Sequence, residues 1–240
     1  IRMAEENASF AMRMEQDKGE VGTRSLEELQ TALGLKHFPK IIEGFDLSNI
    51  FGSHAVGSMV VFENAFAEKS KYRRYKIETV KGIDDYAMLR EVMTRRYIRL
   101  IKENSSFPNL ILIDGGKGHL NAAHDVLEGL GLMDRVDLAC IAKGKFRNNL
   151  ATDEVYLPYK KTPVLFAENS PSRFLMQRIR DEAHRFAITY HRNLRSKSTM
   201  ESPLESIPGI GKKRRLMLLK QFGSFENILK ASLEDLMSLQ

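Results

Sequence analysis

Short apolar runs alternate along the chain with longer stretches in which apolar residues recur every three or four positions. The short runs predict strands at 41–47, 56–63, 71–79, 109–114 and 136–142, with a shorter strand around 155–157. The longer stretches predict helices at about 84–102, 117–130 and 171–195, and we expect Phe174 in the buried stripe of the last one. The order predicts an α/β fold, a mixed β-sheet flanked by helices.

The segments before and after this pattern predict a lead-in and a small helical module. Residues 1–18 predict a helix, and Ser25 with Glu28 forms a capping-box pattern that predicts the start of a second one after a glycine-containing break. A polar run from Ser196 to Pro203 predicts a linker. We therefore expect three parts: a lead-in over 1–40, the sheet domain over 41–199 and an all-α module over 200–240.

Composition places the chain among soluble globular proteins, with 42% hydrophobic and 28% charged residues among 240. No apolar stretch approaches the ~20 residues of a membrane span, and no signal peptide is visible, so we expect a cytoplasmic protein that does not bind membranes. The single cysteine, Cys140, excludes an internal disulfide and is expected to be buried. Because the chain begins with Ile1, we expect it to be a piece of a longer protein.

The formal net charge of +6 is compatible with nucleic-acid binding, although charge alone is weak evidence. The excess lies within 41–199, since 1–40 carry a net −1 and 200–240 a net +1. One basic cluster, 71–76, alternates like a strand, and for it a solvated strand and a phosphate contact are equally good interpretations.

Two aspartates stand at the ends of apolar strands. Asp46 closes the run 41–45, and Asp114 closes the run 110–113 just before two glycines. A turn explains either one alone, but as a pair at one sheet edge they would repel each other unless a divalent cation joined them. Carboxylates that hold Mg²⁺ or Mn²⁺ suit phosphodiester hydrolysis, so we favour a metal site at Asp46 and Asp114.

His184 is the third candidate. It lies at the border of the apolar stripe of the 171–195 helix, where a histidine is usually a packed or half-exposed residue without a role. It follows two acids, has Arg178, Arg180 and Arg185 nearby, and its helix must cover the sheet that bears the aspartates. A neutral imidazole can ligate a metal or move a proton near pH 7.

Two glycine-containing segments suggest phosphate contacts. The segment 114–119 is not a nucleotide-binding P-loop, but its turn is compatible with Lys117 near a DNA phosphate. The second segment, 207–213, combines two glycines with the basic start of a helix. It predicts a clamp on the DNA backbone, and a plain helix–helix turn is the alternative. Its candidate DNA-binding residues are Pro208, Gly209, Ile210, Gly211, Lys212 and Lys213.

Four motifs, in order, resemble the C-terminal half of the UvrC family, a component of the bacterial UvrABC excinuclease of nucleotide excision repair. They are Phe45–Asn49, Leu112–Gly118, Gln177–Ala187 and Ile207–Gly211, and the resemblance covers about residues 25–240.

The resemblance implies an RNase H-like endonuclease domain that cuts damaged double-stranded DNA on the 5′ side of a lesion, within the SOS response. It places Asp46, Asp114 and His184 on the family's catalytic positions and residues 200–240 on the first helix-hairpin-helix of a tandem pair. It also implies UvrB as a partner, mainly through a segment absent here. Gly44 stands where a cysteine is common, and His119 where a glutamine is common.

RNase H-like nucleases usually assemble four acidic ligands, and Glu91 and Asp85 are weaker candidates for additional ones because helix capping and a solvated face explain them better. Two other functions stay open: a non-catalytic DNA-binding scaffold with this fold, and another nuclease of the same fold, such as a ribonuclease H or a junction resolvase. Intact Asp46, Asp114 and His184 argue against the scaffold.

Overall fold

The protein is described by a computed structural model, which covers residues 19–48, 55–80, 82, 84–143, 153–200, 204, 207–223 and 225–237, with side chains of the long helix given to residue 189. The chain forms two compact units, 1–188 and 189–240, and each is described by itself.

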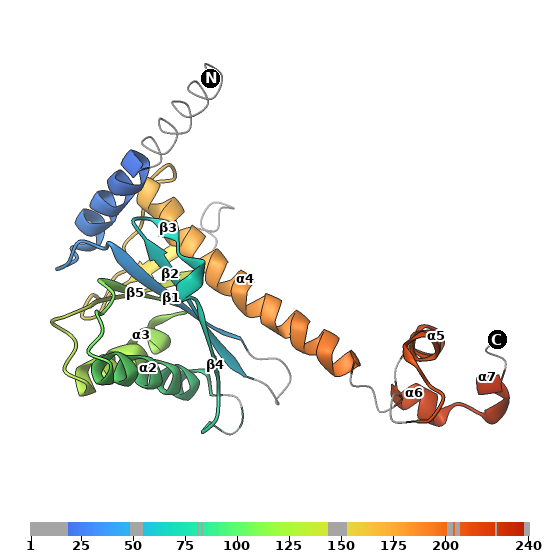
Figure 1. The fold of residues 1–240 in the computed structure, drawn as a ribbon. Helices are drawn as coiled ribbons and strands as arrows, with labels where there is room; N and C mark the ends of the chain where they lie inside the picture. Colours follow the sequence, from blue (N-terminus) through green and yellow to red (C-terminus); the bar gives the residue numbers. More distant parts are fainter. Residues whose placement is uncertain are drawn as a thin grey trace, which may run out of the picture. The chain divides into compact units, whose positions relative to one another are not determined.

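A seven-stranded mixed sheet organises the first unit (Figure 1). Its strands are β1 (Ile41–Ser48), β2 (Val56–Glu63), β3 (Phe66–Ala67), β4 (Arg73–Lys76), β5 (Leu110–Asp114), β6 (Asp137–Lys143) and β7 (Asp153–Tyr156). The order is β3-β2-β1-β5-β6-β7, with β4 also paired to β2. The parallel strands β1, β5 and β6 occupy the centre, and the outer pairs are antiparallel.

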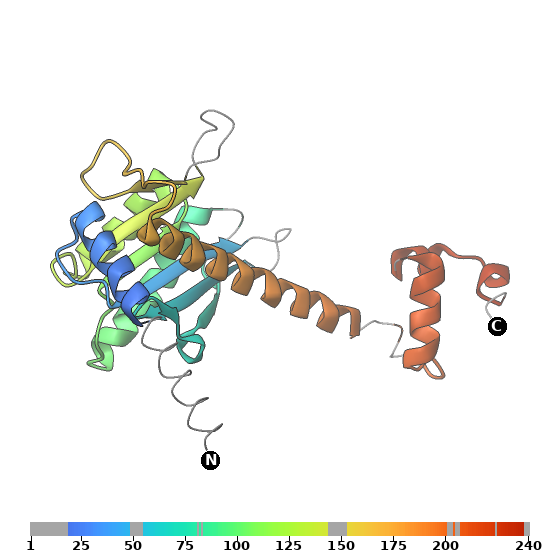
Figure 2. The same cartoon turned by 90° about the horizontal axis from the view of Figure 1, so that it is seen from above.

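Helices cover both faces of the sheet. Helices α2 (Asp85–Lys102) and α3 (Lys117–Gly129) pack on one face, while α4 (Pro171–Met200) and a helix over 19–33 pack on the other. In Figure 2, which views the molecule from above, α4 crosses the sheet. Each face has its own apolar core, which explains why the central strands read as continuous hydrophobic runs.

Strand parity assigns side chains to these two layers, because neighbours along a strand point to opposite faces. In β1, Ile42 belongs to the core under α4, whereas Phe45 belongs to the core under α2. Gly44 shares the α4 face, and a Cβ there would lie 2.6 Å from Cγ2 of Ile179. A glycine at position 44 therefore allows α4 to approach β1 closely.

The structure confirms the mixed α/β sheet, and it differs from the expected elements in several details. The third predicted strand is shorter, and residues 66–67 and the 3₁₀ turn Lys69–Lys71 were not foreseen. Helix α2 begins as predicted, with Asp84 accepting a hydrogen bond from the backbone N–H of Ala87 at 2.9 Å. Cys140 is fully buried in β6, and burial raises the pKa of its thiol to about 12.

The expected capping box at Ser25 is wrong. Residues 19–33 form one helix, and the Ser25 hydroxyl donates to the carbonyl of Gly22 at 2.7 Å from inside it. Gly22 does not break the helix: a Cβ there would lie 3.0 Å from the carbonyl oxygen of Asn64, so this glycine serves close packing. The expected helix over 1–18 lies outside the described residues.

Helix α4 differs from expectation at both ends. Phe174 is 50% exposed, so it does not belong to the buried stripe, which contains Leu175, Ile179 and Ala183. The helix continues to Met200, through most of the polar run that was expected to be a linker. A polar composition does not by itself stop a helix, and the run contains neither glycine nor proline before Pro203.

After the end of α4, the described residues of the second unit form three short helices: α5 (Lys212–Phe222), α6 (Phe225–Lys230) and α7 (Leu233–Met237). The turn before α5 places Gly209 at φ +87°, a conformation that favours glycine. Arg214 closes this turn by donating from Nη1 to the Gly209 carbonyl at 2.8 Å. Across the described parts of both units, every helix is too short or too polar to cross a membrane.

Candidate metal centre

Asp46, Asp114 and His184 come together at one edge of the sheet. Asp46 lies near the end of β1, Asp114 is the last residue of the neighbouring parallel strand β5, and His184 projects from α4. Each residue offers one ligand atom, and these atoms all lie within 4.8 Å of one another. The three residues named from the sequence are therefore neighbours in space.

One contact in the cluster joins Nδ1 of His184 to Oδ2 of Asp46 at 3.2 Å. A carboxylate only accepts when ionised, so this contact favours the tautomer that carries its proton on Nδ1. Nε2 then has a lone pair, and it belongs to a side chain that is 59% exposed, against 9% for Asp46. The imidazole thus presents a basic nitrogen at the open side of a buried acid.

Ser58 on β2 holds the two sides of the cluster together. It pairs with Asp46 in the β1–β2 register and is fully buried. Its hydroxyl lies 3.3 Å from the carbonyl oxygen of Asp46 and 3.2 Å from that of Ala183, the residue before His184. One side chain therefore links the backbone of β1 to the backbone of α4 where each bears a cluster residue.

The donor set fits a divalent cation. Two carboxylates at this separation repel each other, and a cation between them removes that cost. Carboxylate oxygens suit Mg²⁺ and Mn²⁺, and an imidazole nitrogen also binds first-row divalent metals. Three protein ligands leave room for water and a substrate oxygen in a six-coordinate shell.

The two weaker acid candidates do not belong to the cluster found among the described residues. The Glu91 carboxylate instead accepts the backbone N–H groups of Glu78 and Thr79 at 2.9 and 3.0 Å, and it also binds Arg95. Burial works against the charged form of Glu91, but these hydrogen bonds outweigh it and lower the pKa. Glu91 thus fixes the loop before α2.

The arginines near His184 in the sequence are engaged with other groups. Arg180 pairs with Asp153 and Asp181, and Arg185 binds Glu182 through two nitrogens at 2.7 Å each. The hydrogen bonds from Arg185 are the main reason that the pKa of Glu182 is lowered. Among the described residues, Arg180 and Arg185 thus bind neighbouring carboxylates on and near α4.

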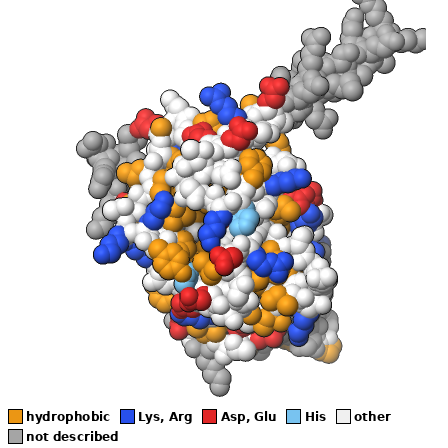
Figure 3. All heavy atoms as spheres, turned by 90° about the vertical axis from the view of Figure 1, so that its left-hand side faces the viewer, with side chains coloured by type: hydrophobic (Ala, Val, Ile, Leu, Met, Phe, Trp, Pro, Cys, Tyr) orange, Lys and Arg blue, Asp and Glu red, His pale blue; other side chains and the backbone are white. Residues whose placement is uncertain are grey.

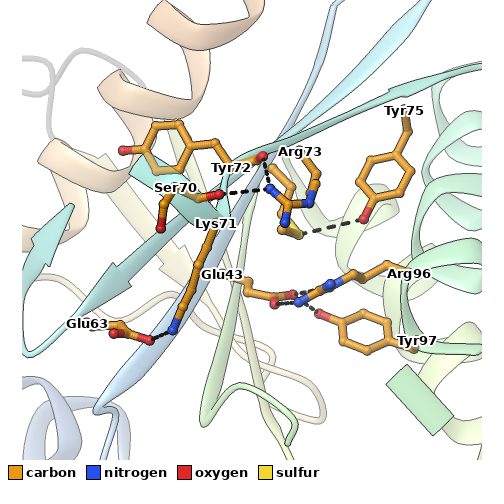
Figure 4. Close-up of polar contacts among 10 residues, drawn as sticks. Glu43, Glu63, Ser70, Lys71, Tyr72, Arg73, Tyr75, Arg96 and Tyr97 are labelled. Atoms are coloured by element: carbon orange, nitrogen blue, oxygen red, sulfur yellow. Dashed lines mark hydrogen bonds and ion pairs between the residues drawn. The ribbon is translucent and has the colours of Figure 1, made fainter. Parts of the chain in front are cut away.

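Two predicted phosphate contacts have internal partners in this structure. Nζ of Lys117 donates to the carbonyl of Lys161 at 2.7 Å, and it lies 4.9 Å from the ring centroid of Tyr156. In the basic run 71–76, Lys71 pairs with Glu63 and Arg73 donates to two backbone carbonyls of its own segment (Figure 4). A DNA contact by Lys117 stays a prediction.

A second buried carboxylate was missed at the sequence level. Glu43, in β1, accepts from Nη2 of Arg96 at 2.5 Å and from the Tyr97 hydroxyl at 3.0 Å, as Figure 4 shows. Burial alone would lower the pKa of Arg96, but Glu43 raises it on balance, and burial with Glu43 raises the pKa of Tyr97 well above its usual value. A charged residue inside the apolar run 41–45 was the available signal.

The side of the sheet domain seen in Figure 3 mixes basic, acidic and apolar side chains. Blue and red groups are interspersed there, so this side offers no continuous basic track for a DNA backbone. The metal cluster lies at the opposite ends of the parallel strands, where β1 and β5 finish.

Comparison with known proteins agrees with the fold. Residues 30–188 match the family described as UvrC RNase H endonuclease domain, and residues 201–240 match the one described as SAM-like helix-hairpin-helix tandem. The first unit is thus an RNase H-like endonuclease domain, and a helix-hairpin-helix module follows it. The chain belongs to the UvrC family.

Curated relatives described as UvrABC system protein C share high identity with the chain. The protein of Dehalococcoides mccartyi is 50% identical over 219 residues, which are 89% of this chain and 35% of that protein. The protein of Geobacter metallireducens is 45% identical over 243 residues, which are 98% and 39% of the two. The chain therefore spans well under half the length of these relatives.

A solved structure with a distant likeness is endonuclease V of Ciona intestinalis in complex with DNA. It has a TM-score of 0.40 and 14% identity, and the match covers 78% of this chain and 99% of that one.

Proposed function

We propose that the chain is a divalent-metal-dependent endonuclease that makes the 5′ incision beside a lesion in nucleotide excision repair. The observation that supports it most is the cluster of Asp46, Asp114 and His184 at the ends of parallel strands in an RNase H-like sheet. The 5′ side and the damaged substrate rest on membership of the UvrC family.

In this proposal Asp46 and Asp114 hold Mg²⁺ or Mn²⁺, and His184 completes the site. The bound cation would supply positive charge against the scissile phosphate. Asp46 also orients the His184 ring, through the 3.2 Å contact to Nδ1. Nε2 of His184 then either ligates the cation or moves a proton at the cleaved bond.

The helix-hairpin-helix module would hold the DNA backbone. Gly209 and Gly211 carry no side chain that could block the approach of a phosphate to the amide groups of the turn, and Lys213 is exposed in the first turn of α5. Replacing both glycines with bulkier residues should weaken binding for all sequences alike and flatten the salt dependence. A change in sequence preference would contradict a backbone clamp.

The proposed partners are damaged double-stranded DNA and UvrB, the latter mainly through a segment outside this chain. The proposed compartment is the cytoplasm, where a buried thiol such as Cys140 needs no disulfide partner.

The decisive experiment is an incision assay on an end-labelled duplex that carries one lesion. The full repair complex, assembled with this chain, is supplied with Mg²⁺, with Mn²⁺ or with a chelator. We expect a cut on the 5′ side of the lesion that needs the cation and is lost in Asp114→Asn.

A matched control is Asp134→Asn, because Asp134 is 96% exposed and pairs only with Lys36 at the surface. It should cut like the unmodified protein. Cutting by Asp114→Asn at the normal rate would contradict the assignment of Asp114 to the site. If the unmodified protein and Asp134→Asn both bind DNA but do not cut it, the non-catalytic scaffold would be favoured.

A further inference from the structure

An exposed tyrosine lies beside the turn that follows Asp114. Tyr86 belongs to the first turn of α2 and is 47% exposed, although the other large residues that α2 contributes to the core are buried. Its ring lies 4.9 Å from the imidazole of His119, centroid to centroid, with the planes at 62°. His119 belongs to the first turn of α3, so residues from two helices form one edge-to-face ring pair.

Two glycines make room for these rings. A Cβ at Gly118 would lie 2.6 Å from Cζ and from the hydroxyl oxygen of Tyr86. A Cβ at Gly115 would lie 2.7 Å from Cγ and Nδ1 of His119. Because both distances are too short for any real side chain, the ring positions depend on glycine at 115 and 118. Gly115 directly follows Asp114, so the ring pair lies beside the turn after Asp114, on the α2–α3 side of the sheet edge that carries the cluster.

Packing alone does not explain this arrangement. Tyr97, in the same helix, shows what a packing tyrosine looks like: it is fully buried, and its hydroxyl donates to Glu43. Tyr86 instead lies against His119 and the backbone at Gly118 while almost half of its surface faces solvent. An aromatic ring that packs on one side and is exposed on the other can serve as a stacking platform.

The place of the ring suggests its ligand. If the cluster binds a scissile phosphate, the bases attached to the flanking nucleotides lie within one nucleotide of the Asp114 turn. Aromatic stacking suits such a base because every base has a π-face, so the contact tolerates any sequence. An enzyme whose substrate is defined by a lesion and not by a sequence meets all sequences and gains from that tolerance.

We propose that Tyr86, supported by His119, stacks on a nucleobase of the incised strand next to the scissile phosphate. The base must be unpaired or separated from its neighbour, since a fully stacked base offers no free face. This inference rests on the proposed function in one respect, namely that Asp46 and Asp114 hold a divalent cation at the phosphate that is cut.

A binding experiment tests the contact without requiring cleavage. The fluorescent base 2-aminopurine is placed at successive positions around the incision point of a damage-bearing duplex, and the chain is added with Ca²⁺ in place of Mg²⁺. We expect strong quenching at one or two positions with the unmodified chain and with Tyr86→Phe, and loss of that quenching with Tyr86→Leu. The dissociation constant should rise about 5- to 150-fold in Tyr86→Leu.

A glycine pair supplies the matched control. Gly118→Ala should displace the ring and weaken quenching although Tyr86 is still present. Gly129→Ala, in the same helix, adds a Cβ that meets nothing within 4 Å and should leave quenching unchanged. Equal behaviour of the two alanine variants would contradict the dependence of the ring on Gly118.

Unchanged quenching and affinity in Tyr86→Leu would overturn the proposal. So would a loss of affinity that is the same for a duplex with an abasic nucleotide at the quenched position, because Tyr86 would then contact the DNA backbone or a protein. This result is independent of whether the chain is a nuclease. Even if the chain cuts no DNA, quenching at a defined position still shows that Tyr86 stacks on a base.

Discussion

Strand β1 carries two buried carboxylates, and the sheet separates them into different chemical surroundings. Glu43 is 2% exposed on the α2 face, and Asp46 is 7% exposed on the α4 face. Glu43 meets the guanidinium of Arg96 and the hydroxyl of Tyr97. Asp46 meets an imidazole and shares its cluster with a second carboxylate, Asp114.

The comparison shows that burial of an acid does not by itself mark a functional site. The negative charge of Glu43 is balanced by the guanidinium of Arg96, and this ion pair holds β1 to α2. Asp46 and Asp114 bring two acids and an imidazole together, and a divalent cation between the carboxylates would offset their repulsion. The partners of a carboxylate, more than its exposure, separate the structural acid from the catalytic candidate.

The largest effect should come from Asp46→Asn. We expect incision to fall by at least about 10²–10³-fold, the cost of losing one charge-stabilising group at a reaction centre. The melting temperature without divalent ions should stay level or rise slightly, because the repulsion from Asp114 disappears. Single-turnover cleavage and thermal melting with and without Mn²⁺ measure both. A normal Mn²⁺-dependent rise in melting temperature would contradict the role of Asp46 in metal binding.

His184→Ala should come next. We expect turnover to fall by about 10²-fold or more, the range of a general acid or base, while DNA affinity changes little. The melting temperature should hardly change, because the side chain is 59% exposed. Metal titrations should show weakened but persistent binding by the aspartates. A stable variant that cuts at a near-normal rate would remove His184 from the site.

Glu43→Gln tests the other side of the comparison. The guanidinium of Arg96 would keep its charge in a site where only 18% of its side chain is exposed, so we expect the free energy of unfolding to fall by about 3 kcal/mol. For a domain of this size that is a melting temperature lower by roughly 6–12 °C. Cleavage per folded molecule and the stabilisation by Mn²⁺ should persist. Loss of cleavage at temperatures where the variant is folded would mean that the two acids are not independent.

The smallest effect should come from Ser58→Ala, which removes the hydroxyl between the Asp46 and Ala183 carbonyls. We expect a loss of about 1 kcal/mol in stability, typical of one buried hydrogen bond. Metal affinity should fall by less than about 10-fold, since Ser58 supports the ligands only through the backbone. Equilibrium unfolding and metal titration measure these values, and an effect as large as that of His184→Ala would mean that Ser58 does more than tie two segments of backbone together.

The sequence predicted the sheet and the meeting of Asp46, Asp114 and His184 better than it predicted the supporting contacts. Apolar runs define β1, β2, β5 and β6 because buried central strands need them, and a polar residue at the end of such a run is easy to notice. Asp46 and Asp114 could therefore be selected, and parallel pairing brings them to one edge.

Contacts between residues distant in sequence could not be predicted. Glu43 and Arg96 are separated by 53 positions, and nothing local tells which arginine a buried acid will meet. For the same reason the capping box at Ser25 gave the wrong helix start. The motif is local, but the packing of Gly22 against Asn64 joins residues far apart in the sequence. The ring pair of Tyr86 and His119 also depends on the meeting of two helices.

The alternation of β1 also has a consequence for folding. A slip of one residue in the pairing of this strand would turn Asp46 away from His184, and the same slip would turn Glu43 away from Arg96. The misregistered molecule would then bury an acid without its cation, which costs several kcal/mol before any metal or DNA is present. The Glu43–Arg96 pair thus favours the strand register in which Asp46 faces His184.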